Sequence, residues 1–220
     1  MRRNLRFWTR YACESAVVEL ALTAVFTLIA VFSADGLDFK ALASVGPYFF
    51  CFAAIFTMMM INTGSQSLYV PLLLAMGETR RNVLLGFHYY RALIITVTIS
   101  LCGLVWLLAP GEVSSIGLRS IPTILCLLIA SCALGSIIGT LLVKWRWVGT
   151  IFIVLLFGLA GGTMGFTGVA IGDALSETNT AVLAAYLERL PWWLVGTALA
   201  AFGLDVAFQW LLLQRQEVKL

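Results

Sequence analysis

The sequence predicts an all-α integral membrane protein with six transmembrane helices, and three observations support this fold class. Hydrophobic residues make up 61% of the chain and charged residues only 11%, whereas soluble domains carry about 25% charged residues. Apolar stretches of about 20 residues, long enough to cross a hydrocarbon core of about 30 Å, recur along the whole chain. These stretches are continuous rather than alternating in blocks of about ten, which disfavours a β-barrel. Backbone groups in lipid must then be hydrogen-bonded within helices.

The apolar stretches place six helices within a single transmembrane domain that covers residues 1–220, with a basic amphipathic segment before the first helix. All seven tryptophans fall near the ends of these helices, where amphipathic rings prefer the headgroup layer. The predicted helices cover residues 12–32, 41–61, 88–109, 121–143, 148–171 and 192–213.

Lysine and arginine positions predict the orientation of the chain. If the amino terminus is cytoplasmic, eleven of the fourteen cationic residues lie on the cytoplasmic side and three lie outside. This bias satisfies the positive-inside rule and puts both termini in the cytoplasm. We therefore expect a plasma membrane protein, of a prokaryotic cell, whose formal net charge of +3 reflects topology rather than nucleic-acid binding. The three external cations are Lys40, Arg119 and Arg189.

Two connections are longer than simple turns. The cytoplasmic segment 62–87 contains Pro71, which we expect to end the second helix, and a short helix that lies along the membrane surface. The external segment 172–190 contains an apolar helical pattern that is stopped by Pro191. That pattern predicts an interfacial helical element between the fifth and sixth helices. An extension of the sixth helix, kinked at Pro191, is the alternative.

A compact charged turn, from Gly77 through Glu78, Thr79, Arg80 and Arg81, interrupts the cytoplasmic segment. Its charges could bind a cytoplasmic partner, or they could serve only as positive-inside anchors.

Together with Gly86, this turn resembles the Gly-x-Thr-Arg-Arg/Lys signature of small permease subunits in the ABC type-2 exporter family. The resemblance implies a six-helix half-transporter in which Gly77 to Arg81 belong to a coupling helix between helices 2 and 3. That helix would dock on a separate ATP-binding cassette subunit, which would bind the ATP and Mg²⁺. The family also implies a homodimer or a pair with a sister permease. The cargo would be a peptide, a lipid or an amphipathic small molecule. This chain departs from some relatives because it has no large external domain.

Missing motifs exclude several other classes. No GxxxxGK[ST] sequence is present to cradle nucleotide phosphates, so an ATP-driven motor would be another polypeptide. The single histidine, His88, and the lack of GxSG, HExxH and DxxD sequences argue against a membrane-embedded enzyme and a metal site. The five cysteines have no CxxC spacing and are interpreted as buried structural thiols. A secondary transporter, a channel or an accessory membrane protein without a motor remains the alternative function.

Charged residues inside predicted membrane helices are expensive and mark candidate functional positions. Glu14, Glu19, Arg91 and Asp205 form this set. Glu14 fits the amphipathic entry segment and is the least informative, and the other three approach from the cytoplasmic side. One interpretation is an internal ion pair between Arg91 and one of the carboxylates. The other is a polar lining at the cytoplasmic mouth of a substrate path.

Small residues at every fourth position predict close helix packing. Gly135 and Gly139 form such a pair in the fourth helix, and Gly158 and Gly162 in the fifth. Packing within one subunit is the first interpretation, and a contact between two copies is the second.

The predicted topology is tested by the accessibility of single cysteines placed in a cysteine-free background. Cysteines at Gly36, Ser114 and Ser176 should react with an impermeant thiol reagent added from outside. Cysteines at positions 79, 145 and 217 should react only after permeabilisation, because the cationic bias places them in the cytoplasm. The opposite pattern at any two positions would contradict the six-helix topology.

Overall fold

The computed structural model describes residues 2–35, 39–109, 111–155 and 192–215 of the chain. Within these ranges every regular element is a helix and no strand occurs. Five of the helices are long and apolar enough to cross a membrane. The predicted all-α class and the membrane-length helices are therefore confirmed. The count of six is not, because residues 156–191 lie outside the described ranges.

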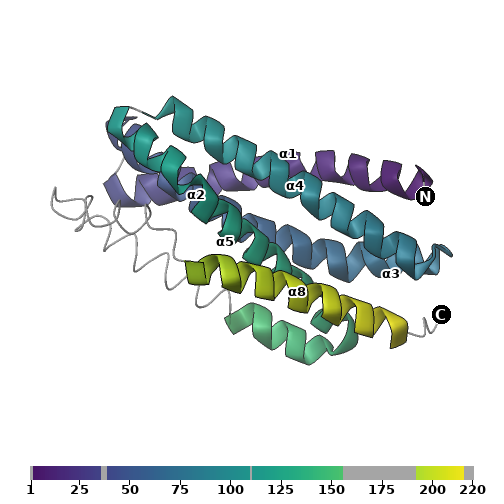
Figure 1. Ribbon diagram of the computed structural model, residues 1–220. Coiled ribbons are helices and arrows are strands. Elements are labelled where there is room, and N and C mark those ends of the chain that lie inside the picture. The colour runs from purple at the N-terminus through teal and green to yellow at the C-terminus, as the bar shows by residue number, and fades with distance from the viewer. Residues whose placement is uncertain (1, 36–38, 110, 156–191, 216–220) are drawn as a thin grey trace.

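The described helices run back and forth along the length of the molecule (Figure 1). The start of α1, the turn between α3 and α4, and the end of α8 lie at one end of the bundle. A further short apolar helix, Arg146–Leu155, follows α5. The named elements are α1 (Arg2–Asp35), α2 (Phe39–Gly64), a π-helical turn (Ser65–Tyr69), α3 (Val70–Ala75), α4 (Arg80–Leu108), α5 (Gly111–Lys144) and α8 (Trp192–Arg215).

Several predicted boundaries are wrong. The N-terminal amphipathic segment is not a separate element, because residues 2–11 are the first turns of the uninterrupted helix α1. Helix α4 begins at Arg80 instead of residue 88, and α5 begins at Gly111 instead of residue 121. The physical reason is that backbone hydrogen bonds extend a helix beyond its apolar stretch, so charged residues near the interface do not end it.

The largest error concerns the second helix, which we expected to end at residue 61. Helical backbone continues through the π-helical turn and α3 to Ala75, so no separate surface helix occupies residues 62–75. Pro71 does not break this run because it lies at the start of α3, directly after the wide turn. Proline is tolerated in a first helical turn, where its missing N–H needs no partner.

The remaining predicted elements fall outside the described residues. Only the beginning of the fifth predicted helix is described, as Arg146–Leu155. The external element at 172–190, Gly158 and Gly162 lie in the range that the structure does not describe.

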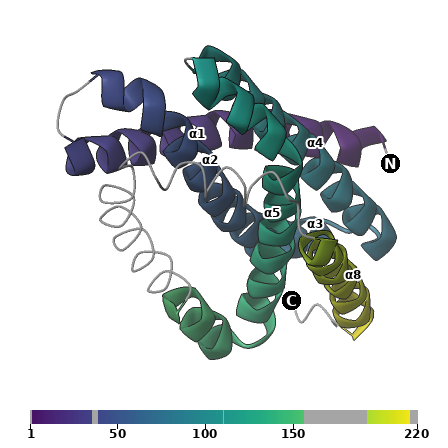
Figure 2. The ribbon, with the colours of Figure 1, turned by 60° about the vertical axis from the view of Figure 1, so that its left-hand side comes forward.

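Helix α5 is the central element of the bundle. It packs against α2, α4 and α8, and Figure 2 shows it between α2 and α8. Helix α1 covers the other side of the bundle, where it packs against α2 and α4. An aromatic cluster closes this junction near the start of α1. It consists of Phe7, Trp8, Tyr11, Tyr69, Phe87 and Tyr90.

Two glycines bring α5 against α2 at backbone distance. A Cβ atom at Gly135 would lie 2.3 Å from the carbonyl oxygen of Met59. A Cβ atom at Gly139 would lie 2.7 Å from both the Thr63 carbonyl oxygen and the Gln66 Cβ. Thr63 uses the close approach to donate a 3.0 Å hydrogen bond to the Gly135 carbonyl oxygen. The structure thus places these two glycines in a contact between helices of the same chain.

The close approach predicts that Gly135→Ala destabilises the protein, although alanine normally favours a helix. The added methyl group would meet the Met59 backbone, which cannot move without separating α2 from α5. We expect a lower midpoint of thermal unfolding for detergent-purified protein, followed by size-exclusion chromatography.

The matched control is Gly203→Ala in α8, where a Cβ atom would meet nothing within 4 Å. That change should leave the midpoint unchanged or raise it, since replacing a helical glycine by alanine gains about 0.5–1 kcal/mol. Equal effects of the two substitutions would contradict the packing role of Gly135.

Candidate functional site

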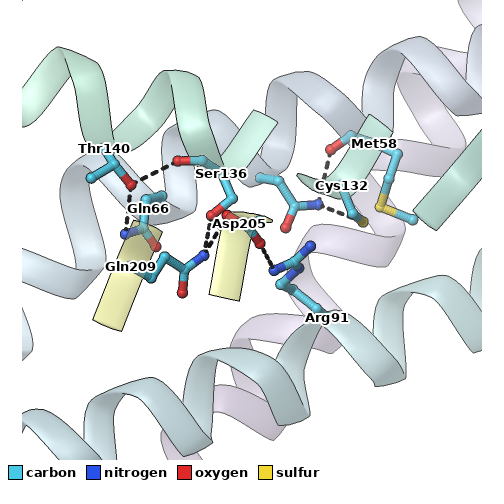
Figure 3. A network of polar contacts seen from close by, with 9 residues as sticks. Met58, Gln66, Arg91, Cys132, Ser136, Thr140, Asp205 and Gln209 are labelled. Carbon is cyan, nitrogen blue, oxygen red and sulfur yellow. Dashed lines mark hydrogen bonds and ion pairs between the residues drawn. The ribbon is translucent and has the colours of Figure 1, made fainter. Parts of the chain in front are cut away.

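The centre of the bundle holds a buried ion pair between α4 and α8. The Arg91 side chain is 2% exposed and the Asp205 side chain is fully buried. The Arg91 Nη1 donates to the Asp205 Oδ2 (Figure 3). An unpaired charge in a membrane interior costs several kcal/mol, so each of these groups depends on the other for its place in the core. The sequence offers two carboxylates, Glu19 and Asp205, as partners for Arg91. In the structure Arg91 pairs with Asp205.

Two aromatic rings flank the guanidinium of Arg91. The Arg91 Cζ lies 5.8 Å from the centre of the Phe87 ring and 5.3 Å from the centre of the Phe202 ring. Phe87 is one turn before Arg91 on α4, and Phe202 is one turn before Asp205 on α8, so the same two helices supply both interactions. Cation–π contacts of this kind contribute most when the cation is desolvated.

A chain of hydrogen bonds connects the ion pair to α5 and to the π-helical turn that follows α2. On α8, the Gln209 Nε2 donates to the Asp205 Oδ1 at 2.8 Å, and it also donates to the Ser136 hydroxyl on α5. One turn further along α5, Thr140 donates to the Ser136 carbonyl oxygen at 2.8 Å and accepts from the Gln66 Nε2 at 3.1 Å. Four helical segments, α4, α8, α5 and the π-helical turn, therefore share one polar network.

Asn62 adds a second contact between α2 and α5. Its Nδ2 donates to the Met58 carbonyl oxygen at 3.0 Å and to the Cys132 Sγ at 3.2 Å.

Some hydrogen-bonding groups of this network have no partner among the described residues. The described residues offer no partner to several of its buried atoms: the Arg91 Nε and Nη2, the Asn62 Oδ1, the Gln66 Oε1 and the Gln209 Oε1. Buried polar groups in native proteins nearly always have partners, so this interior has spare hydrogen-bonding capacity. Both donors and acceptors are available for a polar group that enters the bundle.

Glu19 lies apart from this network. Its side chain is 2% exposed, and its Oε1 accepts a 2.8 Å hydrogen bond from the Thr98 hydroxyl on α4. Thr98 is seven residues, or about 10 Å, beyond Arg91 on the same helix. Of Glu19, Arg91 and Asp205, the structure brings the last two together and leaves Glu19 with a hydroxyl partner.

The charged turn between α3 and α4 has a defined local geometry. Gly77 has a φ of +85°, and the amide groups of Gly77 and Glu78 donate to the carbonyl oxygens of Leu74 and Leu73 at 3.1 and 3.2 Å. This is the Schellman arrangement that ends a helix, and it requires a residue that tolerates positive φ. Thr79 then caps α4 by accepting from the Asn82 amide at 3.4 Å. Gly77 and Thr79 therefore serve the turn itself.

The neighbouring charges differ from the two capping residues. Arg80 and Arg81 are exposed on the first turn of α4, and Glu78 is half-buried. Their exposure at one end of the bundle leaves these side chains accessible to a partner.

The structure adds little support for metal or thiol chemistry. Over the described ranges, no group of three or more His, Cys, Asp and Glu residues is placed to hold a metal ion. All five cysteines are free thiols. Cys51, Cys102 and Cys132 are buried as expected, but Cys126 is half-buried and Cys13 is exposed. The prediction that all five are buried is therefore wrong for Cys13.

Sequence reasoning missed the amide and hydroxyl members of the network. A signal for them exists, because Asp205 and Gln209 are four residues apart, as are Ser136 and Thr140, so each pair shares a helix face. Those spacings do not reveal which helices face each other, so the partners could not be assigned. Comparison of the chain with protein-family models, curated proteins and solved structures found no match.

The ion pair predicts a strong dependence of stability on Arg91. Arg91→Glu should sharply reduce the folded yield in membranes, because breaking a buried pair costs about 3–5 kcal/mol. Adding Asp205→Arg should restore part of the yield, whereas adding Glu19→Arg should not, since Glu19 bonds to Thr98 rather than to Arg91. Fluorescence-detected size-exclusion chromatography of tagged variants measures this yield.

The exposed pair between Arg10 and Glu14 in α1 provides the control. Their side chains are 85% and 61% exposed, and exposed pairs contribute little to stability. Arg10→Glu should therefore leave the folded yield close to that of the unaltered protein. Equal recovery by Glu19→Arg and Asp205→Arg would contradict the observed pairing.

Proposed function

We propose that the chain is the membrane-spanning permease subunit of an ATP-driven exporter. The observation that carries this proposal is the turn from Gly77 to Arg81, which resembles the family signature and lies at one end of the bundle with both arginines exposed. A motor on a separate polypeptide needs a rigid, accessible contact on the permease. The Schellman arrangement at Gly77 and the cap at Thr79 make this turn rigid, and its two arginines supply the charge.

The helices that meet at this turn connect it to the polar interior. Helix α4 begins at Arg80, and Arg91 lies eleven residues, or about 16 Å, along it. On the other side, α3 leads through the π-helical turn to Gln66, at the far end of the same polar network. A motor that moves the turn would therefore displace both ends of the network together. This linkage offers a physical route from ATP hydrolysis to the substrate path.

The proposed assembly and cargo follow from the resemblance and the interior. Two copies of this chain, or one copy with a sister permease, would combine with two ATP-binding cassette subunits in the plasma membrane, with both termini cytoplasmic. The spare donors and acceptors around Arg91 suit the polar part of a peptide, a lipid or an amphipathic small molecule. Export would proceed as closure of the motor subunits switches the path from inward-facing to outward-facing.

A secondary transporter without a motor is the second candidate. It is favoured by Glu19, a buried carboxyl whose described partner is a hydroxyl rather than a cation. Buried ionisable groups of this kind occur in transporters driven by ion gradients. The two candidates differ in whether an ATPase accompanies the chain.

The exporter proposal is tested by charge reversal in the turn, with Arg80→Glu combined with Arg81→Glu. Arginines form charge-assisted, often bidentate bonds with carboxylates, and losing such contacts costs about 2–5 kcal/mol of association. We expect a tagged chain purified from native membranes to carry a subunit with a nucleotide-binding loop and vanadate-sensitive ATPase activity. The double variant should lose both.

The matched control is Lys144→Glu combined with Arg146→Glu, which reverses two exposed cations, one at the end of α5 and one at the start of the short helix that follows it. This variant changes the net charge by the same amount but should keep the ATPase. If the Arg80 and Arg81 variant retains the ATPase and its activity, or if the unaltered chain carries no ATPase, the exporter assignment is wrong.

A further inference from the structure

Helix α1 carries a continuous stripe of buried polar side chains. Ser15, Glu19, Thr23 and Thr27 follow one another at intervals of four residues, so they line one face of the helix. All four are buried although the opposite faces of α1 are exposed and apolar. The stripe extends over about three turns, or roughly 18 Å of the bundle.

Hydroxyl groups from α2 and α4 meet the stripe at successive levels. Nearest the start of α1, Tyr90 donates to Ser15 at 3.3 Å, and the Tyr90 hydroxyl also lies 3.3 Å from that of Ser65. Ser65 in turn lies 3.0 Å from the Tyr11 hydroxyl. This group of four hydroxyls, which we call the Tyr11 cluster, leads from the aromatic junction towards Glu19.

Beyond Glu19, a second group of hydroxyls continues along the same face. Thr23 on α1 lies 3.1 Å from the Thr57 hydroxyl on α2. Thr27 follows one turn later and donates to the Thr23 carbonyl oxygen at 2.7 Å. Glu19, hydrogen-bonded to Thr98, is thus the central member of a track with hydroxyls on both sides. Neighbouring members on α1 are separated by four residues, a rise of about 6 Å along the helix.

Packing alone explains the hydroxyls but not the carboxyl. Thr27 and Thr57 each satisfy their hydroxyl by donating to a carbonyl oxygen of their own helix. An ionised carboxylate has no proton to donate to a carbonyl oxygen of its own helix, and the backbone N–H groups within a helix are already engaged. Glu19 therefore costs free energy that a threonine at the same position would not. Its Oε2 has no described partner although the side chain is 2% exposed.

The surroundings of Glu19 leave its charge without a counter-ion. Among the described residues, no cation forms an ion pair with it. Arg91 is the one buried cation in the part of the chain that the structure describes, and Asp205 already engages it. Among the described residues, the buried titratable groups on the helices that pack against α1 are Cys51 on α2 and Tyr90, Arg91 and Cys102 on α4.

We propose that Glu19 is a proton-binding site and that the hydroxyl track on α1 is the path by which its proton arrives and leaves. The carboxylate takes a proton from water that reaches the Tyr11 cluster and returns it to water through Thr23 and Thr27. The step makes and breaks only O–H bonds, so no oxidant or other reactant is needed. This inference goes beyond the proposed export function and does not depend on a motor subunit.

Dicyclohexylcarbodiimide tests the proposal on the purified, reconstituted chain. This apolar reagent adds the O–H of a protonated carboxyl in a membrane and leaves a stable N-acylurea, which mass spectrometry locates. Glu19 should be labelled at low pH, and the labelling should fall as the pH rises. Asp205 is the internal control, because the Arg91 guanidinium already engages its carboxylate. Labelling of Glu19 should exceed labelling of Asp205 by roughly tenfold or more, because the Arg91 guanidinium occupies the Asp205 carboxylate with a charge-assisted bond.

Variants separate the proton site from a structural role. Glu19→Gln should abolish the label, Glu19→Asp should retain it, and Glu14→Gln on the exposed face should leave it unchanged. Absence of labelling at every pH in folded protein, or equal labelling of Asp205, would overturn the proposal.

The track itself is tested by the rate at which the Glu19 carboxyl exchanges its proton for deuterium, followed by its infrared C=O stretch. Ser15→Ala combined with Thr23→Val should slow the exchange severalfold, because it interrupts both sides of the track. Thr96→Val is the matched control, since Thr96 is exposed on α4 and bonds only to its own helix. Unchanged exchange in the Ser15 and Thr23 variant would refute the path. A failed ATPase co-purification would leave this result untouched, so the two proposals fail separately.

Discussion

The pair formed by Arg91 and Asp205 is the constraint on which the rest of the bundle depends. It fixes α8 against α4 at a depth where neither charge tolerates separation from the other. Gln209 carries the constraint from Asp205 to α5 through Ser136. Helices that face lipid gain little from apolar contact with one another, because lipid tails are equally apolar. In such a bundle, one desolvated ion pair and its hydrogen bonds specify the register of several helices.

The glycine contact between α2 and α5 complements this electrostatic constraint. Gly135 and Gly139 allow the two backbones to approach closely enough for Gln66 to reach Thr140 and for Asn62 to reach Cys132. Bulkier residues at either position would move these amides out of hydrogen-bonding range. Close packing and polar pairing are therefore coupled, since the first sets the distance that the second requires.

The sequence predicted what depends on composition and on single residues. The length of the apolar stretches predicted the membrane helices. The free-energy cost of burying Arg91 predicted that a carboxylate would pair with it. The sequence did not reveal the register between helices, so Gln66, Ser136, Thr140 and Gln209 could not be recognised as neighbours. Hydroxyls in membrane helices also bond to their own backbone, as Thr140 does, which hides any partner across the bundle. The predicted helix end at Pro71 was wrong because the effect of this proline depends on the π-helical turn before it. No sequence pattern predicts that turn.

The π-helical turn at Ser65–Tyr69 has a geometric consequence for everything that follows it. Each residue advances an α-helix by about 100°, and a π-helical turn absorbs one extra residue without interrupting the helix. It lets Ser65 approach Tyr11 and Tyr90 while the adjacent Gln66 reaches Thr140 on α5. A chain shorter by one residue here would form a regular α-helix and turn α3 by about 100° relative to α2. Gly77 and the two arginines would then face another side of the bundle. The single inserted residue therefore determines the direction in which the charged turn points.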